Sequence, residues 1–198
     1  SSDLSSRYTR RNRREFEKAA DYIEEIASAK MGNYMVFFPS YQYMEAVREI
    51  LQERNSKLFL LVQESRMTEE DREAFLAEFS VKREESLAAL CVMGGIFSEG
   101  IDLTGDQLIG VLIIGTGLPQ VNPEQEILKQ YFAENGEDGF DYAYRYPGMN
   151  KVLQAAGRVI RTMEDRGIIA LLDDRFLQPE YQALFPREWR EYFIVTRQ

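Results

Sequence analysis

The sequence predicts an α/β domain of three layers, in which helices flank a mainly parallel sheet on both sides. Short, continuous apolar segments alternate along the chain with longer segments of helical periodicity. Strands buried on both faces have this uninterrupted apolar character, and strand–helix alternation produces a parallel sheet with right-handed crossovers. No repeat or low-complexity linker divides the sequence, so we expect a single domain over residues 1–198.

Five apolar segments are expected to form strands, because each is short and continuous, and five amphipathic segments are expected to form helices. A basic lead-in at 1–12 precedes them. The expected order is helix 13–29, strand 34–38, helix 41–53, strand 58–62, helix 69–79, strand 87–93, strand 108–114, helix 123–134, helix 149–161 and strand 167–173.

Two segments fall outside this alternation. The stretch 134–148 combines glycines, acids and aromatic residues and is expected to be a long irregular loop, of the kind that tends to be functional or mobile. The tail 178–198 is punctuated by Pro179 and Pro186 and is expected to pack back onto the sheet, with a short edge strand near 192–195 as one option. Its expected apolar anchors are Trp189, Tyr192, Phe193 and Ile194.

Composition excludes several classes of chemistry. The chain has no histidine and one cysteine, which rules out Ser-His-Asp and Cys-His catalysis and the usual zinc sites. The net charge of −9 argues against coating nucleic acid by bulk charge. Cys91 cannot form an internal disulfide, so a reducing, cytoplasmic location is expected. No apolar run approaches the roughly 18 residues that a membrane helix needs.

One predicted helix carries a polar stripe suited to phosphate. At about 100° per residue, Gln154, Arg158 and Arg161 lie within roughly 60° of one another, opposite the apolar residues of the helix. Guanidinium groups are permanently charged and planar, and Gly157 has no side chain to block a phosphoryl group. Two alternatives stay open, because the stripe could be a solvated helix face and Arg161 could pair with Asp165.

Three further segments follow predicted strands, where open α/β sheets bind ligands. Ser40 begins a helix as an N-cap or as a phosphate contact. The glycine-rich segment 94–102 is a ligand-approaching loop or a set of tight turns, but it is not a Walker A motif because no lysine follows. Asp173 and Asp174 form a metal-binding pair or a strand-end turn.

In order and spacing, these segments resemble the second motor domain of the XPD/DinG branch of superfamily 2 DNA helicases. The match extends from about Ser6 to Phe176, and its details are closer to bacterial DinG-like proteins. The stretches that carry it are VFFPSY at 36–41 with Met44 and Glu45, GIFSEGIDL at 95–103, GLP at 117–119, YPGM at 146–149, QAAGRVIR at 154–161 and the segment 166–176.

The resemblance implies a RecA-like domain, a P-loop NTPase-like fold that lacks the P-loop here. ATP and Mg²⁺ would be held mainly by a first motor domain of the same polypeptide, which is absent from this sequence. Arg158 and Arg161 would be arginine fingers, and Gln154 would lie near the γ-phosphate and its attacking water. The remaining residues that would border the nucleotide are Glu99, Gly100 and Asp102.

On the other side of the domain, Ser40, Tyr41 and Ser98 would contact single-stranded DNA, and the family implies 5′ to 3′ polarity. No membrane partner is implied. The cysteines that hold an iron–sulfur cluster in many members lie in the first domain, so none is expected in this fragment. Two other classes stay open. One is a magnesium-dependent phosphohydrolase or nuclease that uses Asp102, Asp173 and Asp174, and the other is a non-catalytic interaction module.

Overall fold

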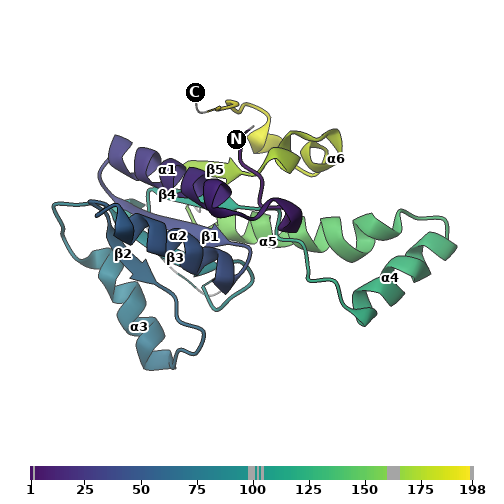
Figure 1. Ribbon diagram of the computed structural model, residues 1–198, viewed down its shortest axis with the longest axis horizontal. Coiled ribbons are helices and arrows are strands. Elements are labelled where there is room, and N and C mark those ends of the chain that lie inside the picture. The colour runs from purple at the N-terminus through teal and green to yellow at the C-terminus, as the bar shows by residue number, and fades with distance from the viewer. Residues whose placement is uncertain (2, 98–100, 102, 104, 160–165, 197–198) are drawn as a thin grey trace.

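Five parallel strands form one sheet in the order β2-β3-β1-β4-β5 (Figure 1). The computed structural model describes residues 1, 3–97, 101, 103, 105–159 and 166–196. Each strand lies within two residues of its predicted bounds, and every pairing is parallel, as predicted. The strands are β1 Asn33–Phe38, β2 Phe59–Val62, β3 Leu87–Val92, β4 Gly110–Ile114 and β5 Ile168–Leu172.

Helices cover both faces of the sheet, which confirms the three-layer prediction. On one face, Val36 and Phe38 of β1 pack among the side chains of α1 and α2, and on the other Met35 and Phe37 pack against α3 and α5. The helices are α1 Arg13–Ala29, α2 Tyr41–Glu53, α3 Glu69–Ala77, α4 Pro123–Glu134, α5 Tyr146–Ala156 and α6 Pro179–Gln182. Short 3₁₀ helices span Tyr8–Arg10, Glu78–Ser80, Gly105–Gln107, Asp174–Leu177 and Arg187–Trp189.

Side-chain caps explain where four of the helices begin. Asn12, Ser40, Thr68 and Asn122 each accept a hydrogen bond from the backbone N–H three residues on. Such a cap satisfies one of the four amides that an α-helix leaves without a partner. Because only Pro39 separates Ser40 from β1, its cap fixes the N-terminus of α2 at the carboxyl edge of the sheet.

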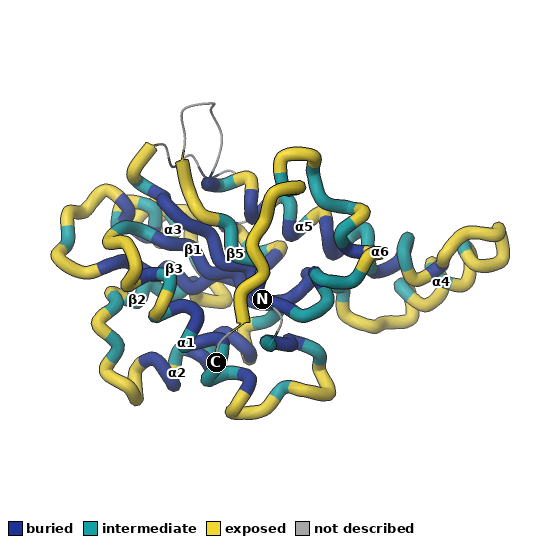
Figure 2. The backbone as a smooth tube through the Cα atoms, turned by 90° about the horizontal axis from the view of Figure 1, so that it is seen from above, coloured by how far each residue is buried: buried dark blue, intermediate teal, exposed yellow. Residues whose placement is uncertain are grey.

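The predicted irregular loop at 134–148 is wrong. Only 135–138 leaves helical conformation, and a π-helical turn, Asp141–Arg145, runs straight into α5. The result is a helical hairpin of α4 against this turn, which projects from the body of the domain in both views (Figures 1 and 2).

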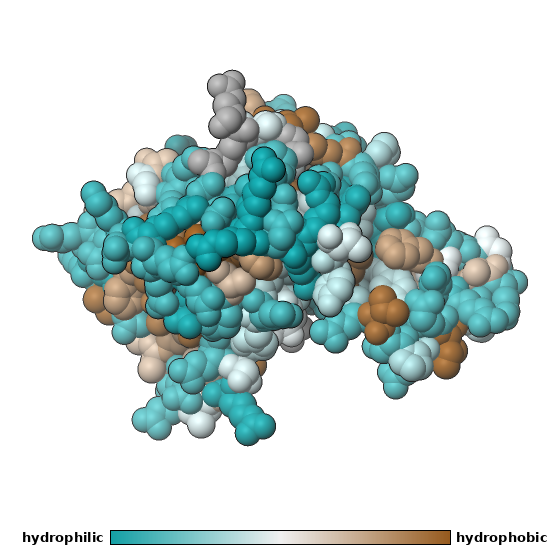
Figure 3. Space-filling view, viewed as in Figure 1, coloured by the Kyte–Doolittle hydropathy of each residue, from teal (hydrophilic) through white to brown (hydrophobic). Residues whose placement is uncertain are grey.

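Aromatic contacts within this hairpin explain the difference. Phe132 of α4 stacks on Tyr142 with ring centroids 4.3 Å apart, and Tyr144 donates its hydroxyl to Glu126 at 2.6 Å. These pairings favour helix where composition indicated a loop. The outer side of α4 stays exposed, and the space-filling view shows hydrophobic surface at this end of the molecule (Figure 3). The exposed apolar and aromatic residues of α4 are Ile127, Leu128 and Tyr131, with Val121 just before the helix.

The N-terminal segment lies along the outer edge of β5. The amino group of Ser1 donates to the Leu171 carbonyl at 2.7 Å, and the Asp174 amide donates to the Leu4 carbonyl at 2.8 Å. The predicted edge strand near 192–195 does not form, so that prediction is wrong. The region is irregular, and the Phe193 side chain is 96% exposed.

The tail before this region does pack onto the sheet. Tyr181 is buried beside Phe176, and Phe185 and Trp189 pack against the same cluster. The predicted anchoring by Trp189 is therefore confirmed. Tyr192 is held in part, since its ring centroid lies 6.1 Å from that of Phe185 and its hydroxyl accepts from Gln182 Nε2 at 2.8 Å. Phe193 and Ile194 are exposed, and their predicted anchoring is wrong.

A buried network ties the N-terminal segment to the ends of β4 and β5. One carboxylate oxygen of Asp173 accepts from the Arg175 amide (3.0 Å) and Nε (2.7 Å), and the other accepts from the Ser6 amide (2.9 Å) and hydroxyl (2.7 Å). Arg175 also donates Nη2 to Ser6 Oγ at 2.9 Å. Gly115, with a φ of +90°, follows β4 so closely that a Cβ there would lie 2.6 Å from Ser6 Oγ.

Two glycines let α5 approach the end of β4. Gly117 follows β4 with a φ of +66°, and a Cβ on Gly148 of α5 would lie only 2.5 Å from the Thr116 carbonyl oxygen and 3.1 Å from the Leu118 amide nitrogen. Both neighbours are backbone atoms, so neither can rotate away. This contact fixes the position of α5 relative to the carboxyl edge of the sheet.

We expect Gly148→Ala to lower the free energy of unfolding by about 1–3 kcal/mol, because the added methyl group would push α5 away from β4. Urea denaturation of the domain measures this change. Gly157→Ala is the matched control, since Gly157 has a φ of −64° and the nearest atom to its Cβ position is 3.3 Å away. Equal stability losses in the two variants would contradict the close-approach argument.

Candidate nucleotide and nucleic-acid interface

The polar stripe of α5 is present where the structure describes it. Gln154 and Gly157 are exposed and Arg158 is half-buried. The opposite side of the same segment is core, formed by Met149, Val152, Ala155, Ala156 and Val159. The predicted separation of faces is therefore confirmed for these residues, and Arg161 lies outside the described part of the chain.

The helix ends earlier than predicted. The last residue of α5 is Ala156, and a tighter turn continues to Val159, with the Arg158 amide donating to Ala155 O (3.2 Å) and the Val159 amide to Ala156 O (3.3 Å). Such i to i−3 bonds are typical of the last turn of a helix. Arg158 donates Nε to the Gln154 carbonyl at 3.2 Å, which satisfies one carbonyl that the helix end would leave unpaired. This bond holds Nε of the Arg158 guanidinium next to the Gln154 carbonyl.

Ser40 and Tyr41 lie together at the N-terminus of α2. Ser40 Oγ accepts from the Tyr43 amide at 3.2 Å, so its role as an N-cap is confirmed. The Tyr41 side chain is held by its hydroxyl, which accepts from Gln63 Nε2 (2.8 Å) and donates to the Glu64 carbonyl (3.3 Å). The aromatic ring is thereby held at the surface, where 36% of Tyr41 is exposed.

Gln63, which follows β2, is a positioning residue that the sequence reasoning missed. It is 2% exposed, and its Oε1 accepts from the Val92 amide at 3.0 Å while its Nε2 holds Tyr41. Gly95 makes room for it, because a Cβ there would lie 2.8 Å from Gln63 Nε2. The sequence signal that could have identified Gln63 is a polar residue directly after a predicted apolar strand. Beside this junction is a pocket of about 370 Å³ lined by Tyr41, Gln63, Glu64, Ser65, Arg66, Met67, Thr68 and Ile96.

The glycine-rich loop after β3 is anchored on both sides of its predicted site residues. Phe97 is fully buried and stacks on Phe75 of α3 with centroids 4.1 Å apart, and Ile101 is 2% exposed. The residues predicted to border the nucleotide or the strand, namely Ser98, Glu99, Gly100 and Asp102, lie outside the described residues.

The strand-end aspartates are committed to internal contacts. Both oxygens of Asp173 accept hydrogen bonds from Ser6 and Arg175, and burial, which alone would raise the pKa of Asp173, is outweighed by these partners, which lower it. Asp174 accepts from the Ser5 hydroxyl at 3.2 Å. A divalent ion would have to displace these donors, and within the described residues no three metal-ligating side chains gather. The geometry therefore does not favour the phosphohydrolase alternative; its third member, Asp102, is not described.

Two arginines of the lead-in, and Arg13 at the start of α1, lie close to acidic side chains. Arg7 and Arg10 lie 3.9 Å and 3.8 Å from Asp174 oxygens, and Arg13 lies 2.5 Å from Glu53. These partners do not support a basic groove at the lead-in. No helix in the described part of the chain combines the length and the apolar character needed to cross a bilayer.

Together, the parallel sheet and the position of α2 and α5 at its carboxyl edge are those of a RecA-like domain. The chain belongs to the helicase C-terminal domain family, whose model matches residues 23–192. Within that family it is a C-terminal helicase domain of the XPD/DinG type, as its sequence resemblance implied.

Relatives of this type include complete helicases. The chain is 28% identical over 182 residues to a probable ATP-dependent helicase of Methanocaldococcus jannaschii, covering 87% of this chain and 28% of that protein. It is 32% identical over 166 residues to the ATP-dependent DNA helicase DinG of Photobacterium profundum, covering 81% of this chain and 22% of that protein. The chain thus spans about a quarter of the length of these relatives.

The fold agrees with solved XPD structures. One XPD helicase structure superposes with a TM-score of 0.71 at 25% identity, covering 92% of this chain and 32% of that one. A second, of XPD without ligand, gives a TM-score of 0.75 at 24% identity over 92% of this chain and 36% of that one.

Proposed function

We propose that this chain is the second of two motor domains in an ATP-dependent DNA helicase, and that it completes a nucleotide pocket held mainly by the first. The observation that carries the proposal is the single solvent-facing side of α5 on which Gln154 and Arg158 lie, next to the exposed Gly157. The partners proposed are a first motor domain of the same polypeptide and single-stranded DNA, in a reducing cytoplasmic compartment.

The residues on α5 fit a nucleotide phosphate. Gly157 has no side chain, so a phosphoryl group can approach the helix end, and Arg158 supplies a permanent charge with planar donors. ATP with Mg²⁺, when bound by the first domain, supplies the phosphoanhydride bond whose hydrolysis drives the motor. Arg158 and Arg161 would stabilise the charge that develops on the transferred phosphoryl group, and Gln154 would orient the attacking water.

The loop after β3 would border the nucleotide through Glu99, Gly100 and Asp102. The buried side chains of Phe97, Ile101 and Leu103 support this proposal, because they flank Glu99 and Gly100 and then Asp102. On the strand side, Ser40 and Tyr41 would contact the DNA backbone together with Ser98. The amides at the N-terminus of α2 favour a phosphate there. Translocation from 5′ to 3′ is part of the same proposal.

The isolated 198-residue chain is expected to show no measurable ATP turnover, because its sequence contains no Walker A motif to hold the phosphates. It should still bind single-stranded oligonucleotides. Phosphate release in the presence and absence of oligo-dT measures the first point, and fluorescence anisotropy measures the second. Robust DNA-stimulated ATP hydrolysis by this chain alone would contradict the two-domain pocket.

A further inference from the structure

Lys151 extends the polar stripe of α5 toward the start of the helix. Residues three and seven positions apart fall on the same side of an α-helix, so Lys151 lies in line with Gln154 and Arg158. The side chain is half-buried, in contrast to the exposed Gln154. It packs against the backbone at Gly94 and Gly117.

The Lys151 stem lies across the turns that follow β3 and β4. Its Cδ and Cε are each 3.4 Å from the position that a Cβ on Gly94 would occupy, and its Cβ is 3.4 Å from the corresponding position at Gly117. Both glycines have positive φ, +73° and +66°. The bare backbone of these turns therefore allows the aliphatic stem to pack closely, as long cationic side chains do when their charged end reaches solvent.

The charge of Lys151 is not neutralised by the described part of the protein. No hydrogen bond or ion pair joins its ammonium group to a described residue. By contrast, Lys18 lies 2.9 Å from Glu15, and Lys129 lies 3.3 Å from Glu126. An uncompensated cation at the carboxyl edge of the sheet, in a chain of net charge −9, is a site for an anion.

We propose that Lys151 is a binding residue for a backbone phosphate of the nucleic acid strand. This inference rests on the proposed function. A strand phosphate is favoured over the nucleotide because Lys151 precedes Arg158 by about two helical turns, or about 10 Å along the axis of α5 and the turn that follows it. Helix α5 thereby carries a strand ligand at its middle, and the turn that follows it carries a nucleotide ligand. A shift of this one rigid element would move both together.

The test is a salt titration of strand binding by the complete 198-residue chain. Fluorescence anisotropy with labelled oligo-dT and oligo-dA is measured for the unaltered chain, Lys151→Gln, Lys151→Arg and Lys57→Gln. Lys57 is the matched control, because it is an exposed lysine just before β2, at the opposite edge of the sheet. The loss of one phosphate contact should reduce the slope of log K against log salt by about 0.7.

Lys151→Gln is expected to bind about five-fold more weakly at 0.1 M salt, equally for both oligonucleotides, because a phosphate contact does not read sequence. Lys151→Arg should retain the slope of the unaltered chain, and Lys57→Gln should match it. An unchanged slope in Lys151→Gln would overturn the inference and leave the proposed function intact. If the unaltered chain binds no strand at all, the strand-gripping function itself fails, and the inference fails with it.

Discussion

Arg158→Ala in the complete helicase is expected to reduce DNA-stimulated ATP turnover by about 10³–10⁵-fold while leaving single-strand affinity nearly unchanged. The guanidinium is proposed to act on charge that is present only in the transition state, so its loss should lower kcat more than it raises KM. Steady-state phosphate release and oligonucleotide anisotropy, measured on the same preparation, separate the two effects.

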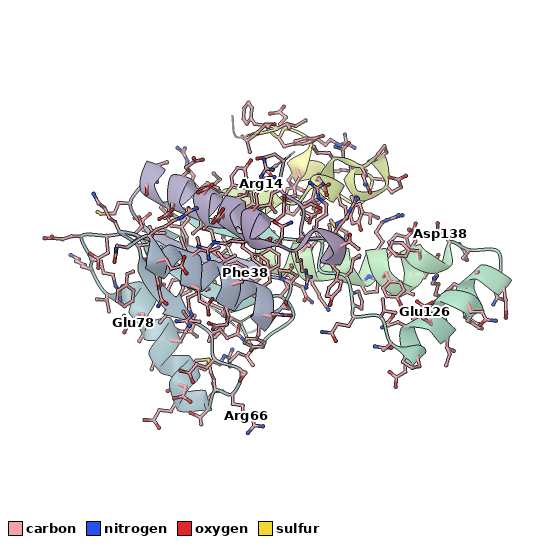
Figure 4. All side chains as sticks on the ribbon, in the orientation of Figure 1. Arg14, Phe38, Arg66, Glu78, Glu126 and Asp138 are labelled. Atoms are coloured by element: carbon pink, nitrogen blue, oxygen red, sulfur yellow. The ribbon has the colours of Figure 1, made fainter. Side chains whose placement is uncertain are left out.

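Arg14→Ala provides the control for this variant, because Arg14 is an exposed arginine on α1 (Figure 4). It removes the same side chain from a surface that is not proposed to meet the nucleotide. Arg158 also donates Nε to the Gln154 carbonyl, so the thermal midpoint of each variant shows whether the helix end has been disturbed. Full ATP turnover by Arg158→Ala, with an unaltered midpoint, would remove the arginine-finger assignment.

The sheet and most helix boundaries were predictable because local signals and burial agree. Each strand of the sheet is a short apolar run, and β1, β3 and β4 are almost wholly buried. Ser40 is both a good N-cap by residue type and an N-cap in the structure. When residue preference, periodicity and burial all favour one conformation, the sequence alone is sufficient to locate an element.

The hairpin was not predictable in the same way. Its glycines indicated a loop, yet Gly139 allows close helix packing, since a Cβ there would lie 2.1 Å from the Lys129 carbonyl oxygen. The stacking of Phe132 on Tyr142 joins residues on either side of the short connection 135–138. Composition reports the presence of glycines and aromatic rings. Composition does not predict which backbone atoms each glycine approaches or which ring each aromatic side chain contacts.

The same distinction applies to the candidate site. Helical spacing was sufficient to place Gln154 and Arg158 on one side, because Gln154 is on α5 and Arg158 is in the turn that directly continues it. Gln63 contacts Tyr41 and Val92, which are distant in sequence, and Lys151 packs against turns after two separate strands. Contacts of this kind depend on the order of strands in the sheet, which no local pattern specifies.

Asp173→Ala is expected to lower the free energy of unfolding by about 3–5 kcal/mol, a large share of the roughly 5–15 kcal/mol that stabilises a domain. The variant would leave the Arg175 guanidinium, whose side chain is 13% exposed, without its carboxylate, and Ser6 without its acceptor. Urea denaturation measures the loss. Asp174→Ala should cost less, because that side chain is 25% exposed and water can replace its partners.

A double variant separates the cost of leaving the buried Arg175 charge unpaired from the cost of the lost packing. In Asp173→Ala with Arg175→Met, no buried cation is left unpaired, so the double variant should lose less stability than the two single changes added together.

The free energy of unfolding of the unaltered domain should also fall at acid pH. The folded pKa of Asp173 is lowered, so the stability it contributes is present above its unfolded pKa of about 3.9 and is lost as the pH falls through the folded value. Asp173→Ala should therefore show a smaller loss of stability below about pH 4 than the unaltered chain. Additive single losses, or equal acid sensitivity in both proteins, would show that this network does not hold the N-terminal segment against the sheet.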